Sequence, residues 1–407
     1  MRRPLRSLWI EWTLAAGFLR EGRTQSLMIT VGVAVGVAVI VFISALIQGL
    51  QANIIERTLG TQAHIRLLSP DETNVLLPVP SGTVHLVQED QRAQRLRSIN
   101  NWQQIIATLD QQPLLTAVSP VVSGPAFVRR GEALESVALV GIDPDRYLRI
   151  IPLARYLVSG QLRVGAGDAL VGTILAADLG VRAGSKLRLD TGQQNSTVVN
   201  IAGIFELGVR ELDARYVYLD LKQAQSLLEL PGGVTVIDLT VTDIFAADTL
   251  AAQIERLTSL NAESWIETNA QLMNALTAQS LSTNMIMVFV AISVAFGIAS
   301  VLSVSVVQRT REIGILRATG ATRQQILRVF LIQGALVSLL GSNAGIAISY
   351  GLVWAFNTFG PGLFYIPVPP ILVLLAILLA TGTGVLAAAV PSRRAAGLDP
   401  VVAIRYV

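Results

Sequence analysis

The chain has 407 residues, of which 52% are hydrophobic and only 14% are charged, and its formal net charge is +3. Soluble domains carry about 25% charged residues, so this composition and a mean hydropathy of +0.56 exclude an ordinary soluble protein and predict a membrane protein. The sequence contains no cysteine, which excludes disulfides, thiol catalysis and cysteine-ligated metals, and its two histidines form no His-Glu-x-x-His pair. No metal site is therefore expected.

The first 26 residues form a basic segment whose apolar residues recur at helical spacing. Trp9 and Trp12 lie on the apolar face, where their rings suit the headgroup level of a bilayer, and arginines flank them. We therefore predict that 1–26 is an interfacial helix lying on the cytoplasmic leaflet. The alternative is a basic leader with no particular role.

Four later segments are apolar enough to cross a membrane. A bilayer core of about 30 Å needs about 20 apolar residues in a helix. The runs that meet this requirement are 27–47, 285–307, 329–356 and 371–390. The last two are separated by a loop, 357–370, that is rich in glycine and proline, which break helices. A signal peptide is the alternative for the first run, but that run exceeds the usual apolar length of about 7–15 residues and no clean cleavage site follows it.

The segment 48–284 is richer in charge and alternates predicted strands with predicted helices. This intermixing predicts an α+β domain of two lobes, in which a β-rich lobe over about 155–232 is inserted into the other. Helical extensions at 48–59 and 269–284 are predicted to form a stalk between this domain and the spans. The segment has no Gly-x-Ser-x-Gly nucleophile elbow, so no catalytic site is expected.

The distribution of charge predicts the orientation, because short cytoplasmic segments are enriched in lysine and arginine. Segments 1–26, 308–328 and 391–407 together hold 13 basic and 4 acidic residues, whereas 48–284 holds 18 basic and 24 acidic residues. We therefore place both termini and 308–328 in the cytoplasm, and 48–284 and 357–370 outside. Arginines beside membrane spans are explained by topology, so no nucleic-acid partner is expected.

The loop 308–328 contains the most informative pattern. Residues 311–318 are predicted to form a short helix that ends at Gly320, and Thr322 then caps the next helix, with Gln325 completing a capping box. The short helix carries apolar side chains among charged ones, which suits docking into a groove on a cytoplasmic partner. The predicted docking residues are Arg309, Arg311, Glu312, Ile313, Gly314, Ile315, Leu316, Arg317, Gly320 and Thr322. The alternative is a solvated basic loop that only fixes the topology.

Residues 311–322, Arg-Glu-Ile-Gly-Ile-Leu-Arg-Ala-Thr-Gly-Ala-Thr, resemble the cytoplasmic loop of the MacB/LolC/LolE/FtsX permease superfamily of ABC transporters. Residues 139–144 and 174–185 look like outer-domain motifs of LolC and MacB, and 391–406 is similar to the family's tail. The order of one span, a large outer domain and three further spans is also the same. The resemblance therefore covers the whole chain, and it implies a bacterial inner-membrane protein with a periplasmic domain.

The resemblance also implies a homodimer or heterodimer that works with two copies of an ABC ATPase, which binds ATP and magnesium. The chain itself is expected to be non-catalytic and to hold no cofactor, because its only lysines, Lys186 and Lys222, fit no Walker A motif. The ATPase is therefore expected on a separate polypeptide, as in the LolC/LolE arrangement. The docking residues of 308–328 would couple ATP hydrolysis to movement of the outer domain.

Two small-residue motifs occur within the spans. Gly32 and Gly36 are four residues apart in the first span, and Gly341 and Gly345 repeat this spacing in the third. Glycines at this spacing let helices approach closely, so these positions are predicted to form a dimer seam or to line a cargo cavity. The alternative is glycine that is merely tolerated in a membrane helix.

The resemblance implies an amphiphilic cargo taken from membrane lipid, with lipoprotein release from the inner membrane as the leading function. One departure is that 189–198 is a short turn, where LolC-like subunits carry a long hairpin hook that receives a periplasmic carrier. Docking of a carrier or adaptor therefore stays open. The alternatives are MacB-like efflux of peptides or drugs with a periplasmic adaptor, and FtsX-like mechanical signalling to a cell-wall partner.

Overall fold

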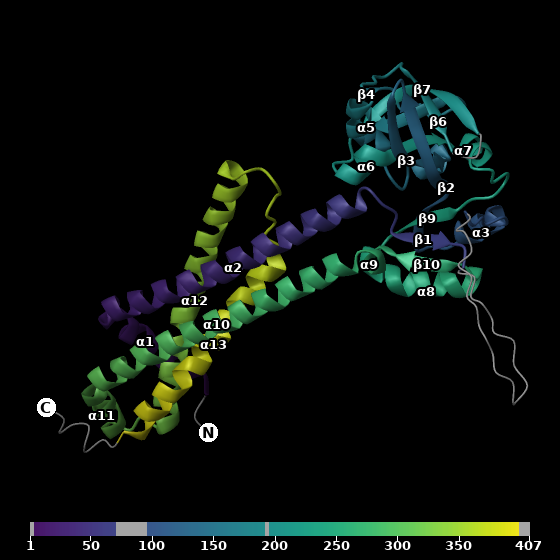
Figure 1. Ribbon diagram of the computed structural model, residues 1–407. Coiled ribbons are helices and arrows are strands. Elements are labelled where there is room, and N and C mark those ends of the chain that lie inside the picture. The colour runs from purple at the N-terminus through teal and green to yellow at the C-terminus, as the bar shows by residue number, and fades with distance from the viewer. Residues whose placement is uncertain (1–3, 71–95, 192–194, 399–407) are drawn as a thin grey trace, which may run out of the picture. The chain divides into compact units, whose positions relative to one another are not determined.

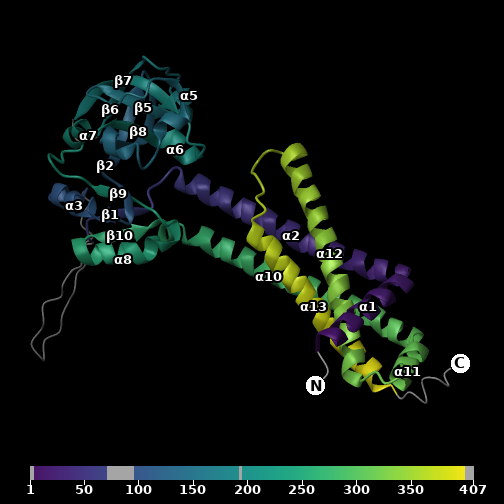
Figure 2. The same ribbon diagram turned by 180° about the vertical axis from the view of Figure 1, so that it is seen from behind.

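The computed structural model describes residues 4–70, 96–191 and 195–398. The chain forms two compact units, one made of 1–55 with 274–407 and the other of 56–273. We call the first the helical unit and the second the α/β unit; both are seen in Figure 1 and, from behind, in Figure 2.

Long helices make up most of the helical unit. Four of the described helices are long and apolar enough to cross a membrane: α2 (Arg23–Leu59), α10 (Ala270–Gln308), α12 (Arg323–Phe359) and α13 (Pro370–Gly397). Two shorter helices are α1 (Pro4–Glu21) and α11 (Thr310–Ala318). The predicted class is a four-span membrane protein with an α+β domain. It is confirmed in that the described residues include four helices able to cross a membrane and a domain of mixed strands and helices. Every long helix extends beyond the run of apolar residues that predicted it, so helix ends do not mark the membrane boundary.

The predicted extensions 48–59 and 269–284 are almost entirely helical, because α2 continues to Leu59 and α10 begins at Ala270. Within the helical unit, Gln51 Nε2 donates to Ser280 Oγ at 3.0 Å and to the Leu276 carbonyl at 3.3 Å. These bonds join the two helices beyond their apolar parts. The role of the extensions as a stalk stays a prediction.

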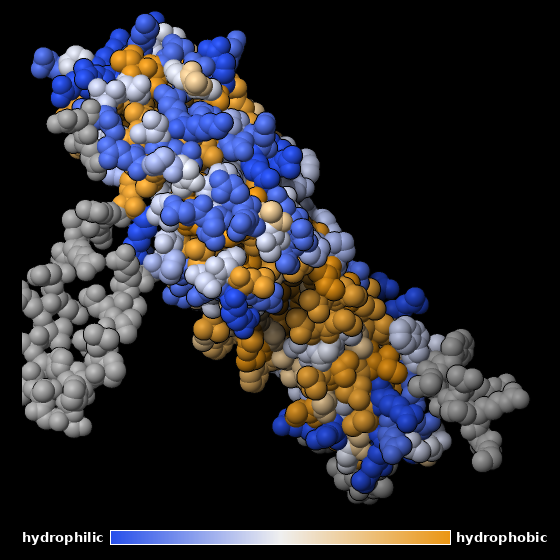
Figure 3. All heavy atoms as spheres, turned by 90° about the vertical axis from the view of Figure 1, so that its right-hand side faces the viewer, coloured by the Kyte–Doolittle hydropathy of each residue, from blue (hydrophilic) through white to orange (hydrophobic). Residues whose placement is uncertain are grey.

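The four long helices are buried to different degrees. Half of the most apolar 18-residue stretch of α12 is buried, whereas only 11% of the corresponding stretch of α10 is buried. Small residues explain the burial of α12, because a Cβ at Gly334 would come within 2.7 Å of the Ala388 Cβ of α13. In the face shown in Figure 3, hydrophobic side chains gather on the helical unit and hydrophilic ones cover most of the α/β unit. The exposed surface of α10 therefore needs lipid or another subunit to cover it.

In its described residues, the α/β unit has ten strands, in the order β10-β1-β9-β2-β3-β8-β5-β7-β4, with β6 pairing with β2 and β7. The strands are β1 (Ile65–Leu68), β2 (Leu115–Arg130), β3 (Ala133–Ile142), β4 (Leu157–Gly160), β5 (Asp168–Gly172), β6 (Lys186–Asp190), β7 (Ser196–Phe205), β8 (Tyr216–Asp220), β9 (Val236–Val241) and β10 (Asn261–Ser264). The helices between them are α3 (Trp102–Leu109), α4 (Pro144–Tyr147), η1 (Leu153–Tyr156), α5 (Thr173–Asp178), α6 (Arg210–Arg215), α7 (Leu221–Leu227), η2 (Ile244–Ala246), α8 (Ala247–Thr258) and α9 (Trp265–Thr268).

Six of these strands form a closed ring of pairings. β2 pairs with β3, β3 pairs in parallel with β8, and β8 pairs with β5, which pairs with β7. β6 then pairs with both β7 and β2. Closure leaves these strands without an open edge, and the aromatic rings of Phe205 and Tyr218, whose centroids lie 5.2 Å apart, belong to the adjoining core.

The predicted division into two lobes is not confirmed. The prediction placed β2 and β3 outside the inserted lobe, but β3 pairs with β8 and β2 pairs with β6, both of which lie within 155–232. One continuous set of paired strands therefore joins the predicted insert to its flanks. These pairings have no local sequence signal because they join distant residues, such as Phe127 and Asp190.

The remaining strands, β9, β1 and β10, extend the sheet from the first half of β2. Ile65 and Leu67 of β1 are fully buried, and the alternating residue Arg66 lies on the opposite face of the strand. α8 packs against β1 and β10 with Leu250 and Ile254 buried, and α3 packs against β2. One face of this part of the sheet is thus apolar, and the other carries polar residues.

Candidate functional site

The loop helix α11 has sharply defined ends. α10 ends at Gln308, and after α11 the chain turns at Gly320, whose φ of +106° is readily adopted by glycine alone. The Gln325 backbone N–H donates to Thr322 Oγ1 at 3.3 Å, and the Thr322 N–H donates to Gln325 Oε1 at 2.8 Å. The predicted capping box is therefore confirmed.

The inner face of α11 belongs to the core of the helical unit. Ile313 is 0% exposed and packs in a cluster with Phe18 of α1 and with Val329 and Phe330 of α12. Gly314 is also buried. Ile313 was predicted to dock on a partner, and in this structure its side chain is covered by α1 and α12 of its own chain. Periodicity shows that a side chain is apolar but not which neighbour covers it.

The outer face of α11 is narrower than predicted. Arg311, Glu312 and Ile315 are exposed, with 48% of Ile315 accessible. Leu316 is half-buried, and Arg317 donates from its guanidinium to the backbone carbonyls of Ala396 and Leu398 near the end of α13. Gly320 and Thr322, after the helix, are exposed as well. The surface offered to a partner is therefore mixed, with one apolar side chain between charges.

Arg309 connects the loop to α1. Its side chain is only 10% exposed, and its guanidinium donates to the Phe18 carbonyl at 2.8 Å and to Glu21 at 3.2 Å. The guanidinium carbon also lies 4.6 Å from the centroid of the Phe18 ring. Arg309 thus positions α11 and is not a surface residue. The sequence signal for this contact is Glu21, an acidic residue in a basic segment.

The four predicted seam glycines serve different purposes. A Cβ at Gly341 would lie 2.6 Å from the Val33 Cβ, and a Cβ at Gly345 would lie 2.4 Å from the Ala34 carbonyl oxygen, so this pair packs α12 against α2 within one chain. Gly341 and Gly345 are therefore not available as a dimer seam. A Cβ at Gly36 would meet Val294 of α10 at 2.5 Å, whereas Gly32 has open space around it.

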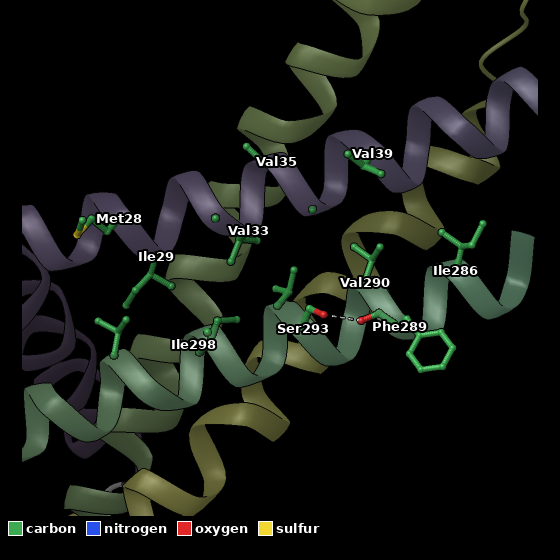
Figure 4. A pocket seen from close by; sticks show the side chains of 15 residues that line it. Met28, Ile29, Val33, Val35, Val39, Ile286, Phe289, Val290, Ser293 and Ile298 are labelled. Atoms are coloured by element: carbon green, nitrogen blue, oxygen red, sulfur yellow. Dashed lines mark hydrogen bonds between the residues drawn. The ribbon is translucent and has the colours of Figure 1, made fainter.

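Gly32 and Gly36 line a groove between α2 and α10 with a volume of about 570 Å³. Figure 4 shows Ile29 and Val33 pointing from α2 toward α10, and Val290 pointing back. The lining residues are Met28, Ile29, Gly32, Val33, Val35, Gly36, Val39, Ile286, Phe289, Val290, Ser293, Val294, Gly297, Ile298 and Val301. The α10 side of this groove was not predicted, although Gly297 is a small residue in that span.

The groove offers almost no polar group. Ser293 is its only polar side chain among the lining residues, and its hydroxyl donates to the Phe289 carbonyl at 2.9 Å within α10. Such a surface favours an acyl chain or another apolar helix over a polar ligand. In the described part of the chain, no three histidine, aspartate or glutamate side chains are grouped to hold a metal ion.

Comparison with known proteins covers both units. Residues 26–257 match the family described as the MacB-like periplasmic core domain, and residues 284–400 match the FtsX-like permease C-terminal family. The chain is 25% identical to the lipoprotein-releasing system transmembrane protein LolC of Xylella fastidiosa, with 92% of each chain covered. It is 24% identical to the lipoprotein-releasing system transmembrane protein LolE of Haemophilus influenzae, with 91% of each chain covered. It is 26% identical to the macrolide export ATP-binding/permease protein MacB of Rhodopseudomonas palustris, over 94% of this chain and 58% of that protein.

Proposed function

The chain belongs to the FtsX/MacB/LolC family of ABC transporter permeases, and from this premise we propose that it is the permease subunit of a system that releases lipoproteins from the bacterial inner membrane. Its four apolar helices and its relatives make it an inner-membrane protein. In this proposal the ATPase is a separate polypeptide, present in two copies, that binds ATP and magnesium. The relative LolC supports this assignment, because its name describes a transmembrane protein and 92% of it aligns with this chain.

The proposed orientation places both termini and α11 in the cytoplasm and the α/β unit in the periplasm. It is supported by the excess of arginine in the short segments 1–26, 308–328 and 391–407. Of the last of these, residues 399–407 lie outside the described residues. This orientation brings the outer face of α11 to the side where ATP is available.

The two-faced character of α11 is the observation that carries the proposal. Its outer face exposes Ile315 between charges, and its inner face is fixed through Ile313, Arg309 and Arg317. A buried contact transmits displacement because protein interiors are close-packed. A movement of a partner bound at Ile315 would therefore pass directly into α1, α12 and α13.

The groove between α2 and α10 is the proposed place for cargo or for the second permease subunit. Its apolar lining and its volume of about 570 Å³ suit the acyl chains of a lipid-anchored protein. Exposure of α10 supports this, because an exposed span must be covered by lipid, cargo or another chain. Gly32 keeps the groove open, since no side chain projects from that position.

Export of a peptide or drug is the second candidate. The identity to MacB is as high as that to LolC, and the turn between β6 and β7 is short, with Asp190 opposite Ser196. Residues 192–194 of the turn lie outside the described residues. A short turn leaves little chain for a hook, so docking of a lipoprotein carrier there is not part of our proposal. Mechanical signalling to a cell-wall partner is the third possibility within the family.

Affinity purification of the tagged chain in mild detergent, followed by mass spectrometry, tests the proposal. We expect an ABC ATPase and a second permease subunit together with bound lipoprotein. Recovery of an ATPase with a periplasmic adaptor and no lipoprotein would favour export over lipoprotein release as the function. Recovery of a cell-wall hydrolase would favour signalling instead. Purification without any ATPase, under conditions that preserve a known transporter complex, would contradict the transporter proposal as a whole.

A further inference from the structure

A second apolar pocket adjoins the groove between α2 and α10. It has a volume of about 300 Å³ and is lined by residues of α2, α10 and α13; we call it the α13 pocket. Gly36 and Val294 line both spaces, and a Cβ at Gly36 would lie 2.5 Å from the Val294 side chain. The contact between these two residues therefore separates the α13 pocket from the groove.

Short side chains keep the α13 pocket open. Ala291 of α10 and Ala376 and Ala380 of α13 line it, and the two alanines of α13 are only 5% and 9% exposed. The walls therefore belong to packed helices whose side chains do not reach across the space. The other lining residues are apolar apart from Asn284 and Thr383.

An amide group stands at one end of the pocket. Asn284 immediately precedes the apolar run 285–307 of α10, whereas Val294 lies near the middle of that run. Asn284 is exposed, and within the described part of the chain its amide has no hydrogen-bond partner. An apolar pocket with one amide at the membrane boundary matches an amphiphile whose polar group stays at the interface.

The dimensions of the pocket indicate the kind of molecule. The ten residue steps from Asn284 to Val294 rise about 15 Å along the helix, which is half of a bilayer core of about 30 Å. A volume of about 300 Å³ over that length gives a mean cross-section of about 20 Å², or a width of about 5 Å. An α-helix with its side chains is about 10–12 Å wide, so the pocket is too narrow for a helix of another subunit.

The lining also excludes an extended peptide, because most N–H and C=O groups of its backbone would have no partner there. A hydrocarbon chain has no such groups, and it would make dispersion contacts with the apolar walls on every side. The length of the pocket matches the chains of one leaflet. Phospholipid surrounds a membrane protein at all times, whereas a cargo is present only in transit, so phospholipid is the favoured source of the chain.

We infer that the α13 pocket holds one acyl chain of a membrane phospholipid. The Asn284 Nδ2 donates to an ester or phosphate oxygen of the same lipid at the edge of the bilayer core. The acyl chain then packs against α10 on the side away from the groove. This binding needs neither the ATPase nor a cargo, so it stands or fails separately from the proposed function.

Native mass spectrometry of the full-length protein in detergent tests the inference, with palmitoyl-oleoyl phosphatidylethanolamine as the added lipid. We expect one tightly bound lipid per chain. Ala291→Leu puts a larger side chain into the pocket and should weaken binding about tenfold or more, because methylenes of the acyl chain lose their site. Asn284→Leu removes one hydrogen bond and should weaken binding about threefold. Gly32→Leu, in the groove but outside the α13 pocket, is the matched control and should bind as the parent does.

Thr383→Leu fills the pocket from α13 and should repeat the effect of Ala291→Leu, which guards against misfolding of either variant. Unchanged lipid binding by both folded variants would overturn the inference, and so would the absence of a tightly bound lipid in a parent protein with a cooperative thermal transition. One-for-one displacement of the phospholipid by an acylated lipopeptide would also overturn it, because the pocket would then be a cargo site. Retention of the phospholipid in excess lipopeptide supports it.

Discussion

The guanidinium of Arg309 donates to the carboxylate of Glu21 at 3.2 Å, across 288 positions of the sequence. The same guanidinium donates to the Phe18 carbonyl at 2.8 Å and is 10% exposed, whereas the Glu21 side chain is 69% exposed. The two ends of this contact therefore contribute unequally. Arg309 holds α11 on α1 mainly through the buried backbone of α1, and Glu21 adds a solvated ion pair.

Substitutions at these two positions should separate the contributions. Arg309→Met removes a charged hydrogen bond to Phe18, which contributes about 1.5–3 kcal/mol, and we expect a clear fall in the thermal unfolding midpoint. Glu21→Gln removes an exposed ion pair with a contribution of about 0–1 kcal/mol, so it should change the midpoint little. Thermal unfolding in detergent compares them, and equal effects of the two variants would contradict the unequal contributions.

The exposed and buried isoleucines of α11 give the sharpest test of docking. Ile315→Asp changes a side chain that is 48% exposed, so the protein should keep its thermal midpoint and lose co-purification of the ATPase. Ile313→Ala should instead lower stability by about 2–5 kcal/mol through a core cavity. Thr24→Asp, exposed near the start of α2, is the control and should retain the ATPase. Retention of the ATPase by Ile315→Asp would remove α11 as the docking element.

Replacement of glycine by leucine should have opposite effects on folding at two positions in the spans. Gly345→Leu would drive a side chain into the Ala34 carbonyl, and overpacking of this kind costs about 1–3 kcal/mol or more. Gly32→Leu meets open space, so the protein should fold normally while the groove between α2 and α10 is narrowed. Thermal unfolding and lipoprotein release measure the two effects. Normal release by a folded Gly32→Leu protein would show that cargo does not enter this groove.

The parts of this structure that sequence predicted are those set by local rules. The length of the apolar runs predicted the four long helices, and the spacing of Thr322 and Gln325 predicted the capping box. Contacts between distant segments were missed, since neither the β2 to β6 pairing nor the burial of Ile313 under α1 has a local signature. Gly341 and Gly345 show the same limit: their spacing predicts a close helix contact but not whether the other helix belongs to the same chain.

His64, which precedes β1 in the α/β unit, should make the stability of the protein depend on pH. His64 Nδ1 lies 3.0 Å from the Val241 backbone nitrogen and 3.3 Å from the Val241 carbonyl oxygen, so a neutral ring can accept from that N–H, whereas a ring with a proton on Nδ1 donates to that carbonyl. Burial lowers the pKa of His64 below its ordinary value of 6.5, and a hydrogen bond from the protonated Nδ1 to the Val241 carbonyl opposes this only partly. Protonation of Nδ1 would break the bond that the amide of Val241 makes.

The sign of the resulting pH dependence follows from proton counts. Below about pH 6.5 the unfolded chain binds a proton at this imidazole while the folded chain does not, so the free energy of unfolding falls as the pH falls toward the lowered pKa of His64. Asp238 acts in the opposite direction, because burial raises its pKa and its protonation in acid favours the folded state. Asp238 contributes equally to the free energy of unfolding of the parent and of His64→Gln. Its contribution therefore cancels when one free energy is subtracted from the other. Thermal unfolding from pH 8 to pH 5 should show a steeper loss of unfolding free energy in the parent than in His64→Gln, and parallel curves would contradict the assignment of a neutral, half-buried His64.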